Sequence, residues 1–203
     1  MNTRALLLSA LATASLFAQT PTQPVPQTPV QPPIVVYEDW SIPNIDVARA
    51  ALDANFHQTE PYLWRWRGAH DSPLVVAGRV HIEPMGIYSK KLKALTEIHD
   101  GGVVAVPDDP ANLGRALALL KKAEVEQLGS SEIVVVNGNY ALEGNLAPPL
   151  FREGPDSHFP NVVVTREDLV HDKRIELLVA ALRGPTARQF LLEKYPGTAI
   201  MSE

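Results

Sequence analysis

The chain has 203 residues, with 18 Lys and Arg against 23 Asp and Glu, so its formal net charge is −5 at pH 7. Because it has no long basic run to contact phosphates, nucleic acid is excluded as a partner. The chain contains no cysteine, which excludes a disulfide framework, a thiolate metal site and a cysteine nucleophile. Its length allows one domain or two small ones around a sizeable core.

The first 33 residues predict export followed by a spacer. One positive charge precedes an apolar stretch at 5–18 that is too short to cross a bilayer comfortably, so we interpret 1–18 as a signal peptide. An amphipathic helix is the less favoured alternative, because the stretch has no polar face. Residues 19–33 carry prolines at close intervals and predict an extended linker. We therefore expect the folded domain at 34–203.

In the remaining sequence, apolar runs typical of strands alternate with helical periodicity. Strands are predicted at 34–37, 53–56, 74–82, 85–88, 103–106, 133–136 and 162–165. Helices are predicted at 45–52, 61–68, 112–123, 173–182 and 186–195. This alternation favours the α/β class over an all-β fold or a helical bundle.

The helix at 112–123 has the strongest apolar periodicity, and Asn112 is its expected N-cap. Arg115 then lies one turn into the helix, where its guanidinium and the free backbone amides can converge on an anion such as an α-carboxylate. From spacing alone, a surface salt bridge to Asp108 or Asp109 is the favoured alternative.

Two further pairs of polar residues are candidates for binding. Asn137 and Asn139 follow a buried strand, where they either satisfy a turn or reach a ligand. His81 and Glu83 share one face of a strand, but no third residue stands at a diagnostic metal-ligand spacing. An exposed polar face is the plainer interpretation of that pair.

Tyr62 and Tyr88 are either core aromatics or apolar walls of a ligand site. The histidines do not combine with a serine or a carboxylate in a recognisable catalytic order, and the sequence has no P-loop, G-x-S-x-G or G-x-G-x-x-G motif. We therefore expect neither an enzyme nor a bound cofactor or metal.

Four ordered stretches carry a family resemblance: HIEPMGIYSKKLKAL (81–95), VPDDPANLGRALALL (106–120), VVVNGNYAL (134–142) and DSHFPNVVVTRED (156–168). Together they resemble consecutive signatures of the NlpA/MetQ methionine-binding proteins. DANFHQTEPYL (53–63) and EKYPGTAI (193–200) stand in the same order as in that family. The resemblance extends from about residue 34 to the C-terminus.

This resemblance implies a type II periplasmic binding protein, in which two α/β lobes joined by crossover segments close on a ligand in the cleft between them. Lobe I is expected at about 34–88 plus the C-terminal part, and lobe II at about 89–165. The implied ligand is methionine or a related small amino acid. The implied partners are an ABC permease and its ATPase, to which the ligand is delivered.

The resemblance also assigns roles to individual residues. Arg115 matches the arginine that contacts the ligand carboxylate, which reverses the preference for a surface salt bridge. Asn137 matches the family's ligand-binding asparagine, and Tyr62 matches a tyrosine of the cleft wall. With the His81 strand face as a further cleft contact, the predicted ligand-binding set is Tyr62, His81, Tyr88, Asn112, Arg115 and Asn137.

The sequence departs from the family pattern at several places. His57-Gln58-Thr59 stand where the family has FQH, which changes the shape and polarity of one cleft wall. Two units are missing: the first strand and helix of the N-terminal lobe, and a helix-strand unit of the second lobe between Leu128 and Gly129. The second loss predicts an unpaired sheet edge.

These departures affect the expected location and function. The family is usually lipid-anchored through a cysteine, so we expect this protein in the periplasm or cell envelope, either freely soluble or tethered by an uncleaved signal segment. Membrane contact is expected only through that segment or the permease. The alternative function is a shortened, non-transporting paralogue that acts as an interaction protein, and the weakest is a metal-binding protein that uses His81 and Glu83.

Overall fold

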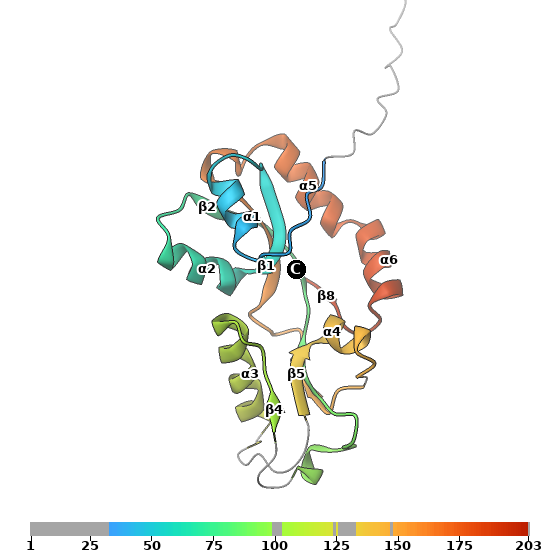
Figure 1. The fold of residues 1–203 in the computed structure, drawn as a ribbon. Coiled ribbons are helices and arrows are strands. Elements are labelled where there is room, and N and C mark those ends of the chain that lie inside the picture. Colours follow the sequence, from blue (N-terminus) through green and yellow to red (C-terminus); the bar gives the residue numbers. More distant parts are fainter. Residues whose placement is uncertain (1–32, 99–102, 124, 126–132, 147, 203) are drawn as a thin grey trace, which may run out of the picture. The chain divides into compact units, whose positions relative to one another are not determined.

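The computed structural model describes residues 33–98, 103–123, 125, 133–146 and 148–202. It divides into an N-terminal segment that ends at Val36 and a compact unit that begins at Tyr37. The predicted signal peptide and nearly all of the predicted linker lie outside the described residues. The compact unit contains two four-stranded sheets with helices packed on them (Figure 1).

The first sheet is antiparallel throughout, with the strand order β1-β7-β2-β8. Its strands are β1 (Ala54–Thr59), β2 (Leu74–Ile82), β7 (Pro160–Arg166) and β8 (Ile200–Met201). The central strand β7 carries consecutive valines at 162–164, and all three are fully buried. A strand buried on both faces needs apolar residues in every position, so β7 is covered from both sides.

Helices cover both faces of this sheet. On one face, α1 (Ile42–Ala48) and α2 (Glu60–Ala69) bury Val47, Leu63 and Trp66 against Val162 and Val164. On the other face, α5 (Lys173–Arg183) approaches Gly78 of β2 through Val179. The last helix, α6 (Pro185–Lys194), has no buried residue and packs mainly on α5.

The second sheet has the order β4-β5-β3-β6 and mixed strand directions. Its strands are β3 (Met85–Tyr88), β4 (Val104–Ala105), β5 (Ile133–Asn137) and β6 (Phe151–Arg152), and only β4 and β5 run parallel. Helix α3 (Pro110–Lys122) packs on one face, where its apolar side chains join those of β3 and β5 in a core of Met85, Ile87, Ala116, Leu119, Leu120, Ile133 and Val135. The short helix α4 (Gly138–Glu143) follows β5 directly, and 3-10 turns occur at Leu95–Glu97 and Glu167–Leu169.

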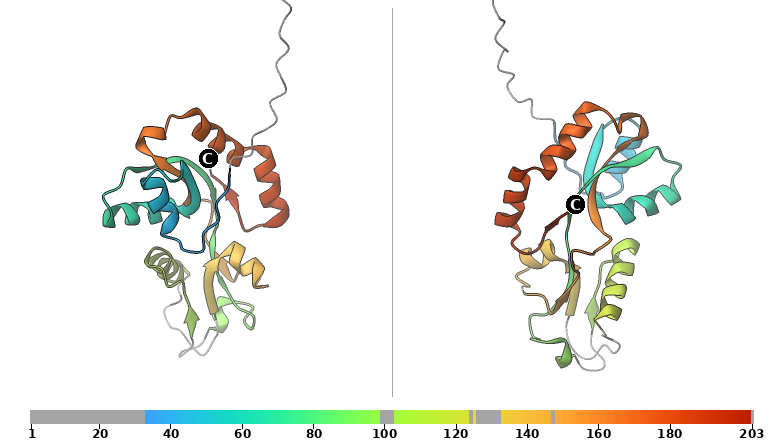
Figure 2. Two further views of the ribbon diagram at one scale, coloured as in Figure 1. Left: turned by 45° about the horizontal axis from the view of Figure 1, so that its top comes forward. Right: turned by 180° about the vertical axis from the view of Figure 1, so that it is seen from behind.

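The chain crosses between the two sheets twice (Figure 2). The first crossing consists of Glu83 and Pro84, between β2 and β3, and the second is the segment 153–159, between β6 and β7. We call them the first and second crossings. The C-terminal segment also touches both parts, because Ser202 N–H bonds the Val80 carbonyl and Arg152 donates to the Gly197 carbonyl.

The strand pairing moves both predicted lobe boundaries. Strand β3, which we assigned to lobe I, belongs to the second sheet, and β7, which we assigned to lobe II, belongs to the first. The sequence shows apolar strands but not their partners, so a boundary between strands cannot be located from local pattern.

Most predicted elements are present, and the segments 74–82 and 85–88 form strands with the predicted bounds. The prediction of a strand at 34–37 is wrong: this segment has no regular structure. An apolar run forms a strand only when a neighbouring strand takes its hydrogen bonds. The helix expected at 45–52 begins earlier, at Ile42, and ends at Ala48, before Ala50 adopts a positive φ of 62°.

The predicted N-cap of α3 is also wrong. Asp109 caps the helix, because its Oδ1 accepts the backbone N–H groups of Ala111 (3.1 Å) and Asn112 (2.9 Å), and Pro110 follows at the first helical position. Asn112 therefore lies within the first turn. The short elements α4, β6 and β8 were not predicted. Over the part of the chain that the structure describes, every helix is too short or too polar to span a membrane.

The close approach of α5 to β2 gives a stability test. A Cβ at Gly78 would lie 2.5 Å from Val179 Cγ1, and a β-branched valine in a helix has little rotamer freedom to move away. We expect Gly78→Ala to lower the free energy of unfolding by about 1–3 kcal/mol, measured by urea denaturation. Gly68→Ala is the matched control, since a Cβ there meets nothing within 4 Å; equal stability of the two variants would contradict the packing of α5.

Candidate ligand-binding site

Arg115 extends from α3 to both crossings. Its Nε donates to Glu153 Oε1 at 2.8 Å and its Nη2 donates to Glu153 Oε2 at 2.5 Å, which makes a bidentate ion pair. Nη2 also donates to the Glu83 carbonyl at 2.9 Å. The guanidinium carbon lies 4.4 Å from the centre of the Phe159 ring. One side chain therefore links α3, the first crossing and the second crossing.

The Arg115 side chain is only 1% exposed, yet its Nη1 has no hydrogen-bond partner within the described residues. A buried, unpaired donor of a guanidinium is costly, and such groups are rare in native structures. The surface salt bridge to Asp108 or Asp109, which spacing alone favoured and the family resemblance overruled, is not formed, because the partner of Arg115 is Glu153 and the pair is buried. Nη1 remains as a donor for an additional anionic group.

Glu153 is well supplied with donors. Besides Arg115, its Oε2 accepts the backbone N–H of Met85 and the Ser157 hydroxyl, both at 3.0 Å. Burial alone would raise the pKa of Glu153, but the hydrogen bonds and charge of Arg115, with the two other donors, outweigh it and hold the pKa below its usual range. Glu153 is therefore ionised at neutral pH and keeps Arg115 in place.

Glu83 contacts three of the residues predicted to bind ligand. Its carbonyl accepts from Arg115, its Oε1 lies 3.2 Å from His81 Nε2, and its Oε2 accepts from Asn137 Nδ2 at 3.5 Å. Burial opposes ionisation of Glu83, but the contacts with His81 and Asn137 and the charge of Arg115 lower its pKa overall. The structure thus brings His81 and Asn137 to the carboxylate of Glu83, and Arg115 to its carbonyl, at the first crossing.

Asn137 ends β5 and occupies the N-cap position of α4, although its side chain makes no cap hydrogen bond. Its amide is therefore directed to Glu83. His81 is 7% exposed, and its Nδ1 is buried without a hydrogen-bond partner among the described residues. His81 therefore retains hydrogen-bonding capacity that the described part of the protein does not use.

Asn112 lies at the beginning of α3, where its Nδ2 donates to Asp109 Oδ2 at 2.9 Å. Tyr62 of α2 is near the same carboxylate: burial raises its pKa, and the negative charges of Asp109 and Asp39 raise it further. Tyr140 of α4 behaves similarly, since burial raises its pKa and Glu83, Glu143 and Asp109 add to the effect. Asp109 is thus bonded to Asn112 and raises the pKa of tyrosines on two other helices, α2 and α4.

An aromatic wall adjoins Tyr62. The His57 ring lies 6.3 Å from the ring of Tyr62 and 5.9 Å from that of Trp40, and its Nε2 is 3.1 Å from the Trp40 carbonyl. Burial lowers the pKa of His57, with the Trp40 carbonyl acting in the opposite direction. The residue that departs from the family pattern is therefore part of this wall. Neither His57 nor Trp40 was among the predicted ligand contacts.

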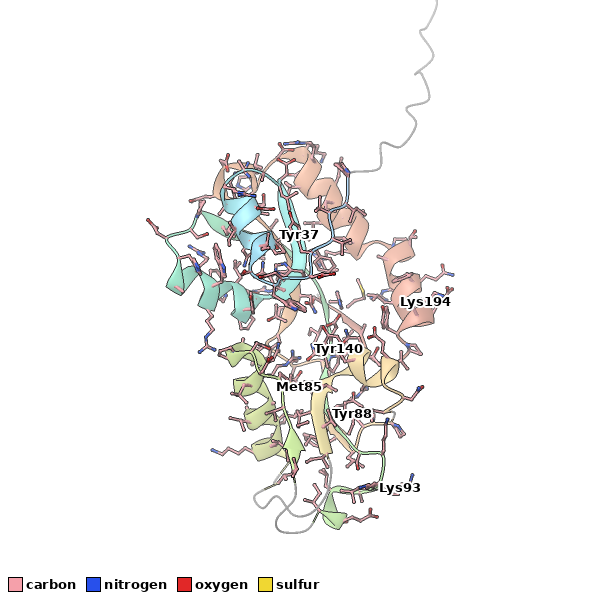
Figure 3. All side chains as sticks on the ribbon, viewed as in Figure 1. Tyr37, Met85, Tyr88, Lys93, Tyr140 and Lys194 are labelled. Carbon is pink, nitrogen blue, oxygen red and sulfur yellow. The ribbon has the colours of Figure 1, made fainter. Side chains whose placement is uncertain are left out.

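Tyr88 lies away from the other residues predicted to bind ligand. Its position on β3 pairs with Val134, whereas Met85, at the start of the strand, pairs with Asn137. At about 3.3 Å per residue, Tyr88 lies about 10 Å along the strand from Asn137. Tyr88 is 4% exposed, and its ring lies over Gly86; Figure 3 labels it on the ribbon of the second sheet. Tyr88 is thus a core residue of the second sheet.

Cavities flank the second crossing. One, of about 520 Å³, is lined by α2, α3 and the segment 153–159, and it includes Arg115 and Phe159. Another, of about 720 Å³, lies among α2, β2, the second crossing and β8, with Trp64 and Met201 in its lining. Within the described residues there is no group of three or more His, Asp or Glu side chains that would hold a metal.

Sequence reasoning missed Glu153, the residue on which Arg115 depends. Glu153 follows a two-residue strand and belongs to no periodic pattern, and it is 38 positions from Arg115. The signal that was available is chemical: a buried arginine requires an acidic partner. The sequence did not show that Arg115 is buried or which of its 23 acidic residues is the partner.

The Arg115–Glu153 pair gives a second test of the structure. Glu153→Gln removes one charge of a buried pair and leaves the other uncompensated, so we expect the free energy of unfolding at pH 7 to fall by about 3 kcal/mol. Urea denaturation measures the change. Glu193→Gln, at an exposed helical position, is the control and should change stability by no more than about 0.5 kcal/mol.

The same pair should make stability pH-dependent. Because the folded-state pKa of Glu153 is lowered, its contribution is present above the unfolded carboxyl value of about 4.3 and is lost as pH falls through the folded pKa. Thermal melts across acidic pH should therefore show a smaller loss of Tm for Glu153→Gln than for the unmodified protein. Parallel Tm–pH curves would show that Glu153 is not the titrating partner of Arg115.

Comparisons with known proteins agree with this architecture. A model of the NlpA lipoprotein family matches residues 28–132 and 124–202. The D-methionine-binding lipoprotein MetQ of Escherichia coli O157:H7 is 30% identical over 206 residues, which cover 82% of this chain and 76% of the relative. Outer membrane lipoprotein 3 of Mannheimia haemolytica is also 30% identical, over 82% of this chain and 78% of its own length.

Solved structures give the same result. The periplasmic substrate-binding protein of an ABC transporter from Coxiella burnetii superposes with a TM-score of 0.77 at 33% identity, covering 84% of this chain and 87% of that protein. A nutrient-binding protein from Burkholderia cenocepacia, solved bound to methionine, has a TM-score of 0.74 at 28% identity, with 82% and 86% covered. These matches confirm the predicted α/β fold of the periplasmic binding protein type. The chain therefore belongs to the NlpA lipoprotein family of ABC-transporter substrate-binding proteins, which are not enzymes.

Proposed function

We propose that this protein is the extracytoplasmic solute-binding component of an ABC importer, which binds methionine or a related amino acid between its two sheets. The observation that carries the proposal is the unpaired Nη1 of the buried Arg115. An α-carboxylate would supply the acceptor that this donor lacks. Family membership supports the proposal, since the relative from Burkholderia cenocepacia was solved with methionine bound.

The proposed contacts follow from the arrangement of side chains. Arg115 takes the ligand carboxylate, and the ligand's other polar atoms contact His81, whose Nδ1 is unpaired among the described residues, and the neighbouring Asn137. Asn112 and Tyr62 border the same region through Asp109. Tyr88 is left out, because it lies in the core of the second sheet.

The side chain of the ligand would meet the aromatic wall of Trp40, His57 and Tyr62. Aromatic rings pack favourably against a thioether, which supports methionine as a ligand. His57 stands where the family has phenylalanine, so the wall is more polar than in the family pattern, and both of its ring nitrogens already contact oxygen atoms. We therefore propose an amino acid with an unbranched, weakly polar side chain.

Delivery of the ligand to a permease and its ATPase, after export directed by residues 1–18, completes the proposal. It is supported by the relative from Coxiella burnetii, which is described as the substrate-binding protein of an ABC transporter.

A shortened, non-transporting paralogue is the second candidate. The family model matches this chain in two pieces that overlap at 124–132, which supports the proposed loss of a helix-strand unit there. The exposed helix α6, with no buried residue, is a second feature of a reduced domain. This candidate predicts a stable fold and retained association with the permease, without ligand binding.

Calorimetry of the full chain against a panel of amino acids, including L- and D-methionine, tests the first candidate. We expect saturable binding of methionine or a close analogue, and weaker binding of its carboxamide, because the amide lacks the charge that Arg115 recognises. No binding of any member at millimolar concentration would contradict the proposal and favour the paralogue.

Asn137→Ala provides the site-specific test. The Asn137 side chain makes no cap hydrogen bond, and its contact with Glu83 is long, at 3.5 Å. Its removal should therefore lower Tm only slightly while it weakens ligand affinity about tenfold, the effect of about one good hydrogen bond. Gln189→Ala, which removes an exposed amide that bonds only Glu193, is the control. An unaltered affinity of the Asn137 variant would remove this residue from the site.

A further inference from the structure

Three residues proposed to bind ligand come from different elements and meet at Glu83. His81 is on β2, Asn137 caps α4 and Arg115 is on α3, and each contacts Glu83 at 3.2, 3.5 and 2.9 Å respectively. Among the hydrogen bonds and ion pairs of the described residues, none joins these three side chains directly to one another. Glu83 is therefore the residue that connects the three, while Glu153 also holds Arg115.

A backbone hydrogen bond and close packing hold the first crossing against the start of α4. The carbonyl of Pro84 accepts the Gly138 N–H at 3.0 Å, so the first crossing is bonded to the start of α4 through both a backbone and a side-chain contact. A Cβ at Gly138 would lie 2.9 Å from Thr198 Cβ, which leaves the α4 terminus little room to shift. The Glu83 carboxylate is thus presented to Asn137 from a fixed position.

The burial of Glu83 is also informative. Its side chain is 26% exposed, whereas that of His81 is 9% exposed. A carboxylate that is mostly removed from water is retained only where it has donors, and here two of the donors are residues proposed to bind ligand. A carboxylate at the surface could be solvated by water and would need neither His81 nor Asn137 as a donor.

We propose that Glu83 is a positioning residue of the ligand site, whose carboxylate orients His81 and Asn137 for the ligand while its carbonyl orients Arg115. This inference rests on the proposed function. It assigns to the first crossing a part in ligand recognition, and not only in the connection between the two sheets.

Glu83→Gln tests the proposal, because glutamine has nearly the same size but lacks the charge and one acceptor oxygen. We expect the affinity for the ligand found in the amino-acid panel to fall at least tenfold, with Tm within 2 °C of that of the control Glu193→Gln. Wild-type affinity in Glu83→Gln would overturn the proposal.

A double-mutant comparison separates positioning from direct contact. In a background that carries both His81→Ala and Asn137→Ala, Glu83→Gln should have less than a twofold effect, because the two side chains that it orients are absent. An undiminished effect in that background would show that Glu83 acts without them and would overturn the positioning role.

A ligand-free measurement keeps the inference separate from the proposed function. In heteronuclear NMR spectra of the full chain, the NOEs that define the Asn137 and His81 side-chain rotamers should change in Glu83→Gln and stay unchanged in Glu193→Gln. If wild type binds no member of the panel, the proposed function fails on its own, and these NOEs still decide whether Glu83 orients its neighbours. Unchanged rotamers in Glu83→Gln would overturn the inference.

Discussion

The ion pair between Arg115 and Glu153 connects parts of the protein that the chain itself keeps apart. Arg115 belongs to the helix on the second sheet, while Glu153 begins the crossing that returns to the first. Since Arg115 also bonds the Glu83 carbonyl at the other crossing, both connections are tied to α3. A buried pair of this kind contributes little net stability compared with an apolar pair, but it is demanding in geometry and penalises alternative arrangements.

The proposed ligand site lies around Arg115, whose position the ion pair with Glu153 determines. With its Nε and Nη2 engaged by Glu153 and Glu83, Arg115 has one unpaired donor, and that donor is buried. His81 and Asn137 are arranged around the Glu83 carboxylate, and His81 Nδ1 is likewise buried without a partner among the described residues. Unsatisfied buried groups lower stability, so the two that lie beside this crossing, on Arg115 and His81, point to a role other than stability.

The local sequence pattern predicted correctly those helices and strands whose own residues determine their structure. It failed where the structure depends on contacts with residues far away in the sequence. The strands at 74–82 and 85–88 and the helix at 173–183 have apolar periodicity that any neighbour can cover, and the structure contains them. The segment 34–37 is equally apolar but forms no strand, because strand formation depends on a partner. For the site, the family resemblance supplied Arg115 and Asn137, whereas Glu153 and the central place of Glu83 depend on contacts across 38 and 54 residues that no local pattern encodes.

The brevity of the first crossing has a mechanical consequence. Between β2 and β3 stand only Glu83 and Pro84, and the ring of proline fixes one of the few backbone dihedrals there. The second crossing, 153–159, is longer and contains Gly154. The longer crossing is held to α3 by the Arg115–Glu153 pair. A change in the angle between the sheets would therefore turn close to Glu83, so the residues proposed to bind ligand would move less than the outer edges of either sheet.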